Sequence, residues 1–175
     1  MLFADASGFT RFAEHTAPED VARALNQMFE GCVQTLLEHD GIVDKLMGDA
    51  VMAVFGAPII RSDHAGQAVD AATMIQSRGR KIFPDTWKGA RLRIGINSGT
   101  AFVGRVGSGD CTDYTAVGDT VNVAQRLQTE AQPGEILISD RVYEQLGEKY
   151  PTAERRVLQV KGHEEAVVAY TLKPK

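Results

Sequence analysis

The chain has 175 residues, of which 43% are hydrophobic and 24% charged, a composition typical of a globular protein with a proper buried core. Its formal net charge of −4 argues against a protein that binds the phosphate backbone of nucleic acid, so we expect no nucleic-acid partner. The two cysteines, Cys32 and Cys111, are too few for a disulfide framework, and they favour a reducing compartment.

The sequence carries no pattern of a membrane segment or a targeting signal. No apolar run approaches the roughly 20 residues that span a bilayer, and no signal peptide is recognisable. We therefore expect a cytoplasmic protein, or the cytoplasmic domain of a larger or membrane-attached one. The length suits one core and the sequence contains no repeat, so we expect residues 1–175 to form a single domain.

The first ten residues, MLFADASGFT, combine an apolar run with an acid and a glycine loop. Residues 1–4 fit a buried strand, and Asp5 stands where that run stops. A carboxylate at the end of a buried strand, beside a loop with free N–H groups, suits a metal ion and a phosphate together. The alternative is an Asp that only caps the following turn.

A second acid, Asp49, lies in a segment with the pattern of a β-hairpin. A helix is expected to begin at Pro18, and two apolar runs then follow at residues 42–47 and 50–55, joined by Gly48-Asp49. A two-residue turn with Gly first is a strong hairpin signal, although on its own it is usually structural. If the first strand pairs beside this hairpin, Asp5 and Asp49 meet, and two carboxylates there could hold two Mg²⁺ ions about 3.5–4 Å apart.

The rest of the chain alternates between short strands and helices. Hairpins are frequent in this pattern, which predicts an α+β fold with a mostly antiparallel central sheet flanked by helices. The expected elements are a helix from residue 62, strands at 91–96, 100–106 and 114–117, with 100–106 turning back from 91–96, a helix carrying Asn122 and Arg126, a strand at 135–138, a helix at 140–146, and a closing hairpin of 156–160 and 166–172.

Three stretches of the sequence, taken in order, resemble one known family. They read FADASGFT, DKLMGDAVMAVFG and DYTAVGDTVNVAQR, and contain Asp5, Asp49 and Arg126. They are similar to the catalytic domain of class III nucleotide cyclases, the adenylate and guanylate cyclases, and to its Thr-bearing bacterial-type subgroup. The resemblance covers nearly the whole chain and implies a ferredoxin-like, palm-type cyclase fold. Because the chain starts almost at the catalytic strand, we expect regulatory domains in a longer parent protein.

The resemblance implies a reaction in which the ribose 3′-hydroxyl attacks the α-phosphorus and pyrophosphate leaves. Such chemistry needs mainly positioning and charge neutralisation. Asn122 is expected to orient the ribose, and Arg126 to stabilise charge on the phosphates. Asn122 and Arg126 are four residues apart and so share one helix face. The other implied contacts are Asp5, Asp49 and Ala6 to two Mg²⁺ or Mn²⁺ ions, and Gly8, Phe9, Thr10 and Lys161 to the substrate.

Lys45 and Thr115 match the two positions that read the base in this family. A Lys can donate to adenine N1, where guanine carries a donor instead, and a hydroxyl can accept from the adenine amino group. The pair therefore points to ATP as substrate, and to a subgroup of which some members respond to bicarbonate, a candidate activator. Without the resemblance, the alternative interpretation is that Lys45 is a solvated side chain on a strand and that Thr115 is simply a residue that favours strands.

One departure from the family pattern lies before the third stretch, where Cys111 stands about where relatives often carry a basic residue; Arg105 is a candidate substitute.

Because relatives build each site from two subunits, the resemblance implies a two-fold homodimer. We therefore expect an adenylyl cyclase that makes 3′,5′-cyclic AMP. The alternatives are a guanylyl cyclase, which Lys45 disfavours, and a catalytically weak module that binds nucleotide or dimerises.

Overall fold

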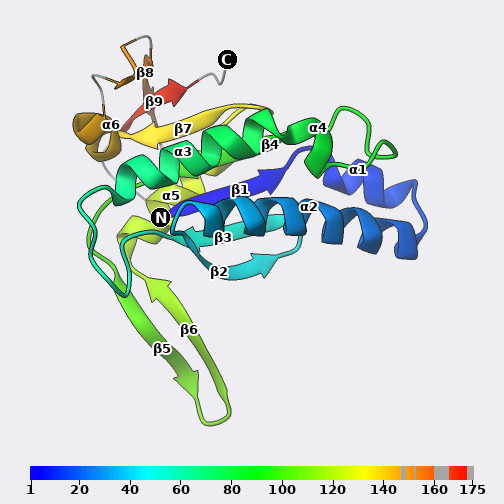
Figure 1. Cartoon of the computed structure of the whole chain (residues 1–175), viewed down its shortest axis with the longest axis horizontal. Coiled ribbons are helices and arrows are strands. Elements are labelled where there is room, and N and C mark those ends of the chain that lie inside the picture. Colours follow the sequence, from blue (N-terminus) through cyan, green and yellow to red (C-terminus); the bar gives the residue numbers. More distant parts are fainter. Residues whose placement is uncertain (147–148, 152, 160–165, 173–175) are drawn as a thin grey trace.

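The computed structural model of this chain describes residues 1–146, 149–151, 153–159 and 166–172 (Figure 1). Its strands and helices alternate along the chain, as the sequence pattern predicts. Their bounds are β1 Leu2–Ala6, α1 Phe9–Glu14, α2 Pro18–Glu38, β2 Ile42–Met47, β3 Ala50–Val54, α3 His64–Ser77, α4 Gly79–Ile82, β4 Leu92–Ile96, β5 Phe102–Ser108, β6 Cys111–Val117, α5 Asp119–Glu130, β7 Ile136–Ser139, α6 Asp140–Leu146, β8 Glu154–Leu158 and β9 Val167–Leu172.

In the described part of the chain, a seven-stranded sheet forms the centre, in the order β2-β3-β1-β4-β7-β9-β8. Every neighbouring pair is antiparallel except β4 and β7, which are parallel. The expected α+β class with a mostly antiparallel sheet is therefore confirmed. No helix among the described residues is long and apolar enough to cross a membrane.

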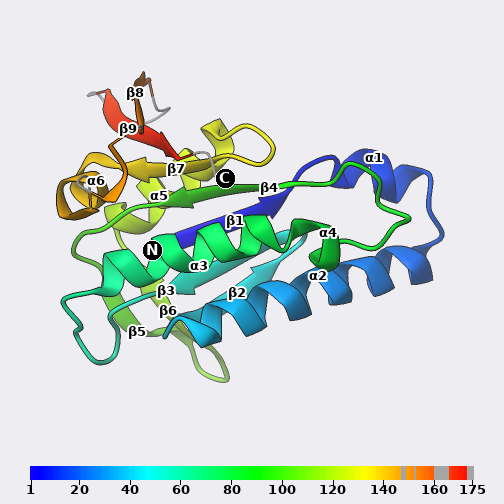
Figure 2. The ribbon, with the colours of Figure 1, turned by 45° about the horizontal axis from the view of Figure 1, so that its top comes forward.

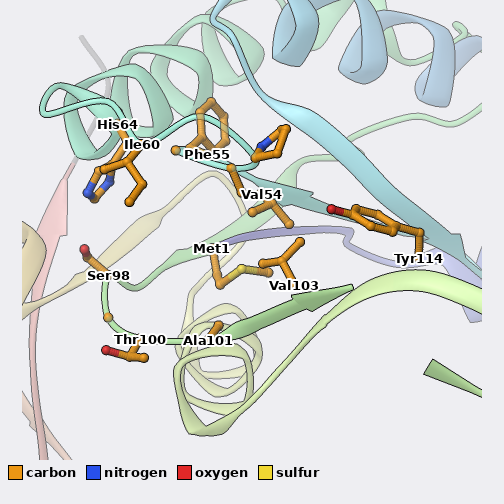
Figure 3. A pocket seen from close by; sticks show the side chains of 14 residues that line it. Met1, Val54, Phe55, Ile60, His64, Ser98, Thr100, Ala101, Val103 and Tyr114 are labelled. Atoms are coloured by element: carbon orange, nitrogen blue, oxygen red, sulfur yellow. The ribbon is translucent and has the colours of Figure 1, made fainter. Parts of the chain in front are cut away.

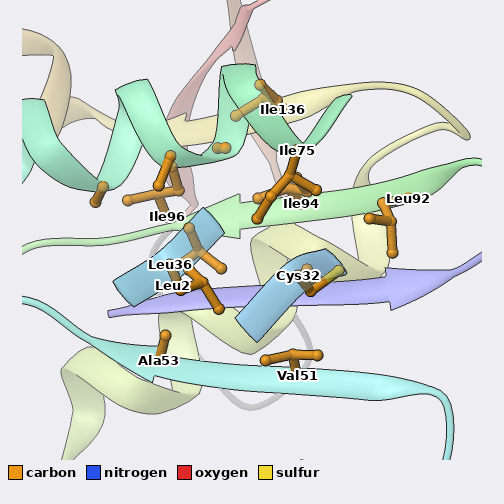
Figure 4. Packing of buried hydrophobic residues seen from close by; sticks show 14 of the residues in the cluster. Leu2, Cys32, Leu36, Val51, Ala53, Ile75, Leu92, Ile94, Ile96 and Ile136 are labelled. Carbon is orange, nitrogen blue, oxygen red and sulfur yellow. The ribbon is translucent and has the colours of Figure 1, made fainter. Parts of the chain in front are cut away.

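One face of the sheet is covered by α2 and α3 (Figure 2). Alternate residues of the central strands point to this face, because successive side chains of a strand lie on opposite sides. Figure 4 shows Leu36 of α2 and Ile75 of α3 packed over Leu2, Val51 and Ile94, all of them fully buried. This packing fixes β1 in the middle of the sheet and so fixes the position of Asp5.

The opposite face of the sheet carries α5, which packs directly on β4. The contact is made at Gly95, where an added Cβ would overlap the backbone nitrogen of Gln128 and the carbonyl oxygen of Ala124. A strand glycine of this kind lets a helix backbone approach closely. Residues on this face of the sheet, Phe3 and Met52 among them, pack against Ala124 and form a second buried cluster.

Strands β5 and β6 form a separate antiparallel hairpin that projects from the body of the molecule (Figure 1). We name it the arm. The expectation that the strand after residues 97–99 turns back onto the preceding one was wrong. Both edges of β4 are already paired, with β1 and with β7, so β5 has to leave the sheet. The base of the arm is fastened by Thr120, whose hydroxyl donates to the Thr100 carbonyl at 2.6 Å.

Candidate active site

Two acids meet at one edge of the sheet. Asp5 lies near the end of β1, opposite Ala50, and Asp49 lies in the β2–β3 turn after Gly48, whose φ of 59° suits the glycine. The N–H of Ala6 donates to the Asp49 carbonyl at 3.2 Å, which ties the turn to β1. The pKa of the Asp49 carboxyl is raised above its ordinary value, first by burial and then by the negative charge of Asp5. The two carboxylates therefore lie within electrostatic range of each other.

An arginine that the sequence analysis did not single out lies against this pair. Arg93 on β4 is opposite Asp5, and its Nε donates to Asp5 Oδ1 at 3.0 Å. Its Nη2 makes a second, shorter contact to the same oxygen. The signal in the sequence was a charged residue between the buried Leu92 and Ile94 of a strand. The position at which it meets Asp5 depends on the β1–β4 register, which the sequence pattern does not give.

The donor set at this edge suits a hard divalent cation. Among the described residues no cluster of three or more His, Cys, Asp or Glu side chains could hold a metal ion. A cation here would rest on Asp5 and Asp49, on a backbone oxygen such as that of Ala6, and on substrate oxygens. Mg²⁺ is often bound in this way, through one or two carboxylates together with phosphates. The pKa of the Asp49 carboxyl is raised first by burial and second by the charge of Asp5, and a cation would offset the repulsion between the two acids.

The loop after β1 lies beside the two acids. Gly8 has a φ of 75°, is exposed, and stands just before α1, of which Phe9 and Thr10 are the first two residues. The first N–H groups of a helix have no partner within the helix, so they remain available to an anion. A pocket of about 680 Å³ beside this loop is lined by Gly8 and by the cationic side chains of Arg11 and Lys88. Another pocket, of about 420 Å³ on the α2–α4 side of the molecule, is lined by none of the predicted site residues.

Lys45 and Thr115 meet at a third residue, Asp44. Thr115 on β6 donates its hydroxyl to Asp44 Oδ1 at 2.8 Å, and the Lys45 Nζ lies 3.6 Å from the same oxygen. The ammonium group of Lys45 also lies 3.5 Å from Asp113 of the arm. The body and the arm thus bring the two predicted base-reading residues together. Asp44 was missed in the sequence analysis, because a strand acid next to a Lys carries no distinctive pattern.

Asn122 and Arg126 lie one turn apart on α5, as their spacing predicts. Asn122 is exposed, whereas Arg126 is partly buried. The Nη1 of Arg126 is buried and has no hydrogen-bond partner among the described residues. A buried guanidinium nitrogen without a partner is costly, and it indicates a position prepared for an anion.

The structure leaves one predicted site residue unplaced, since Lys161 lies outside the described residues. A pocket of about 440 Å³ at the opposite end of β1 is lined by Met1, Val103 and Tyr114 and by none of the predicted site residues (Figure 3). On one chain, the remaining residues form an acidic group at Asp5 and Asp49, a base-reading group at Lys45 and Thr115, and a polar pair on α5.

Comparison with known proteins places this chain in a family. The sequence model described as "Adenylate and Guanylate cyclase catalytic domain" matches residues 1–174. A protein named "Adenylate cyclase 1" from Rhizobium meliloti is 36% identical over 132 residues, which are 73% of this chain and 20% of that protein. The chain thus spans about a fifth of the length of that relative.

Two solved structures are similar over almost the whole fold. The guanylyl cyclase Cya2 superposes with a TM-score of 0.92 at 32% identity, covering 97% of this chain and 88% of that one. The adenylyl cyclase CyaB from P. aeruginosa superposes with a TM-score of 0.87 at 28% identity, covering 99% and 93%. The chain belongs to the family of adenylate and guanylate cyclase catalytic domains, and its fold is that of a class III cyclase.

Proposed function

We propose that this chain is an adenylyl cyclase catalytic domain, comprising residues 1–175, which converts ATP to 3′,5′-cyclic AMP and pyrophosphate. The observation that carries the choice of ATP is the meeting of Lys45 and Thr115 at Asp44. This meeting supports the choice, because a Lys ammonium can donate to adenine N1 and a neighbouring hydroxyl can accept from the 6-amino group. Guanine presents a donor at N1 and an acceptor at position 6, so this pair suits it poorly.

Asp5, Asp49 and the Ala6 carbonyl would hold two Mg²⁺ or Mn²⁺ ions. When bound, the ions would activate the ribose 3′-hydroxyl and neutralise charge on the reacting phosphate and the leaving pyrophosphate. The role of the two carboxylates is to fix these charges at the end of β1. Burial first, and the negative charge of Asp5 second, raise the pKa of the Asp49 carboxyl, and this crowding of two acids supports a site for cations.

The phosphates and the ribose would be positioned by α5 and by the loop after β1. Arg126, with its unpartnered buried Nη1, would neutralise charge on the phosphates, and Asn122 would orient the ribose. The amides around Gly8, together with Phe9 and Thr10, would contact the triphosphate. The resemblance to the family adds Lys161 to this set.

A homodimer would complete the site. Exposed apolar side chains lie on β2 and along the arm, where a monomer would leave them in water. They are Leu46, Met47, Phe102, Val106, Tyr114 and Val117. A two-fold dimer would cover them and bring the acids of one subunit to the base-reading residues of its partner. The subgroup that the chain resembles adds two further parts to this proposal. They are bicarbonate as an activator, and regulatory domains in a longer parent protein.

An experiment distinguishes the proposed adenylyl cyclase from two other functions. The similarity to the guanylyl cyclase Cya2 favours a guanylyl cyclase. The exposed Cys111 favours a module of low activity, although Arg105 lies close by and donates to Thr112 at 3.2 Å. The test is to measure cyclic AMP from ATP and cyclic GMP from GTP, with Mn²⁺ and then with Mg²⁺. Cyclic AMP as the main product supports the proposal. Cyclic GMP as the main product, or no product from either nucleotide, contradicts it.

A further inference from the structure

The side chain of Asp44 is a buried carboxylate with a partner on each oxygen. Only 2% of the side chain is exposed. Its Oδ1 accepts the Thr115 hydroxyl at 2.8 Å, and its Oδ2 accepts the backbone N–H of Ala116 at 2.9 Å. One acid of β2 therefore holds two successive residues of β6, one of which is predicted to read the base.

A register shift explains how Asp44 reaches the arm. On β2, Val43 lies opposite Ala53 and Lys45 lies opposite Met52, so one residue, Asp44, is extra between them. A bulge of this kind bends the strand and redirects a side chain. Here it leaves Lys45 on the same side of the sheet as Met52, while the carboxylate of Asp44 points to the arm.

The contacts of Asp44 determine the direction of its hydrogen bond with Thr115. The N–H of Ala116 can only donate, which makes Oδ2 an acceptor. A carboxylate is acceptor-only, so Oδ1 accepts the Thr115 hydroxyl at 2.8 Å, and the ammonium group of Lys45 lies 3.6 Å from the same oxygen. The hydroxyl proton of Thr115 must therefore go to Asp44, and Thr115 keeps only lone pairs for any other partner.

We propose that Asp44 is a positioning residue that turns Thr115 into an acceptor and thereby selects purines with a 6-amino group over those with a 6-oxygen. A free hydroxyl both donates and accepts, and so would tolerate either group. With its proton held by Asp44, the hydroxyl accepts from an amino group and repels a carbonyl oxygen. This inference rests on the proposed function, in which Thr115 contacts the base.

The test compares three nucleotides in Asp44→Asn and in the original chain. Purine riboside triphosphate lacks the 6-amino group but keeps N1 as an acceptor, and inosine triphosphate carries a 6-oxygen. In Asp44→Asn the amide oxygen must still face the N–H of Ala116, so the amide NH₂ faces Thr115 and frees its hydroxyl proton. We expect the original chain to favour ATP over purine riboside triphosphate by about tenfold in kcat/KM, the value of one hydrogen bond. In Asp44→Asn this ratio should persist, because the freed hydroxyl can still accept from the 6-amino group. The preference for ATP over inosine triphosphate should instead fall by about tenfold, because the freed hydroxyl proton can donate to the 6-oxygen.

Matched measurements separate positioning from general damage. Thr115→Ser keeps the hydroxyl and should keep the preference for ATP over both other nucleotides. Dissociation constants of 3′-deoxy-ATP and 3′-deoxyinosine triphosphate, which cannot cyclise, should change in parallel with the kcat/KM ratios. If Asp44→Asn lowers kcat/KM for all three nucleotides equally, Asp44 only supports the fold and the proposal is overturned.

A second variant leaves Asp44 in place and so covers the case in which Asp44→Asn does not fold. In Thr115→Asn the carboxylate of Asp44 should attract the amide NH₂ and leave the amide oxygen for the base, so the preference for ATP should survive. Loss of the preference for ATP over inosine triphosphate in Thr115→Asn would overturn the role of Asp44. If the original chain itself makes cyclic GMP or shows no preference for the 6-amino group, the proposed function has failed. A preference for ATP over inosine triphosphate in the original chain that Asp44→Asn leaves unchanged refutes only the inference on Asp44.

Discussion

The guanidinium group of Arg93 is paired with the carboxylate of Asp5, with Nε 3.0 Å from Oδ1. Asp5 is one of the two acids proposed to hold the cations, so Arg93 occupies an oxygen that a cation would use. The pair is partly buried, with 32% of the Arg93 side chain and 17% of the Asp5 side chain exposed, so a cation from solvent can reach the carboxylate. Arg93 is thus a competitor of the cations for Asp5.

This competition predicts that Arg93→Gln binds Mn²⁺ more tightly than the original chain when no nucleotide is present. Removing one positive charge from the immediate surroundings of a cation site should tighten binding by about tenfold. Titration followed by the Mn²⁺ resonance signal measures the affinity directly. Arg91→Gln is the matched control, since the Arg91 guanidinium donates to the Ala90 carbonyl and pairs with no acid in the structure described here. Equal affinities in all three chains would refute the competition.

The close packing of α5 on Gly95 predicts a large loss of stability in Gly95→Ala. The added Cβ would overlap backbone atoms of Ala124 and Gln128, and backbone cannot move aside as a flexible side chain can. Overpacking of this kind costs about 1–3 kcal/mol of unfolding free energy. Because α5 also carries Asn122 and Arg126, turnover should fall more than stability alone explains.

Gly66→Ala is the control for that substitution. It lies inside α3, and its added Cβ would meet only Leu146 Cδ2, at 3.8 Å. Alanine favours a helix over glycine by about 0.5–1 kcal/mol, so Gly66→Ala should be neutral or stabilising. Denaturant unfolding of both variants measures the difference. A Gly95→Ala chain as stable as Gly66→Ala would show that α5 does not rest on β4 as described.

The two cysteines are predicted to differ sharply in reactivity. Cys111 is exposed on the arm, whereas Cys32 is fully buried in α2, and burial raises the pKa of its thiol to about 12. The thiolate is the reactive form, so Cys32 should not react in the folded chain near neutral pH. A thiol-specific chromogenic reagent should modify one cysteine in the native protein and two in denaturant. Rapid modification of both cysteines in the native protein would contradict the burial of Cys32.

The part of the fold that the sequence predicted well depends on local signals. The Gly48-Asp49 turn between two apolar runs gave the β2–β3 hairpin, and Asp140 gave the start of α6. The pairing of β5 could not be read in this way. It depends on whether the edge of β4 is free, and β7, which occupies that edge, lies forty residues further along the chain.

The same reason explains which site residues the sequence missed. Asp5 and Asp49 were found because each stands at the end of an apolar run. The position of Asp44 depends on a bulge in β2, and the contact of Arg93 with Asp5 depends on the register of β1 on β4. Both are effects of pairing between strands, and a single strand's pattern does not contain them. The roles of all these residues remain predictions that the variants described here would test.

The last prediction concerns the sharing of one site between two chains. On one subunit Asp5 lies near the end of β1 and Asp49 lies in the β2–β3 turn. Arg126 lies on α5 and belongs, in the proposed dimer, to the other half of the site. Asp49→Ala and Arg126→Ala should each be inactive as homodimers, since every site then lacks one group. Each variant should still fold, because neither side chain is part of the buried core.

Mixing the two variants should restore activity. A heterodimer of Asp49→Ala and Arg126→Ala holds one site that lacks both groups and one site that is intact, because two-fold symmetry places the two lesions together. Activity per heterodimer should reach roughly half that of the original dimer, measured as cyclic AMP after the chains are mixed and exchange is verified with two different affinity tags. If tagged heterodimers form and remain inactive, Asp49 and Arg126 serve the same site within one chain, and the shared site is refuted.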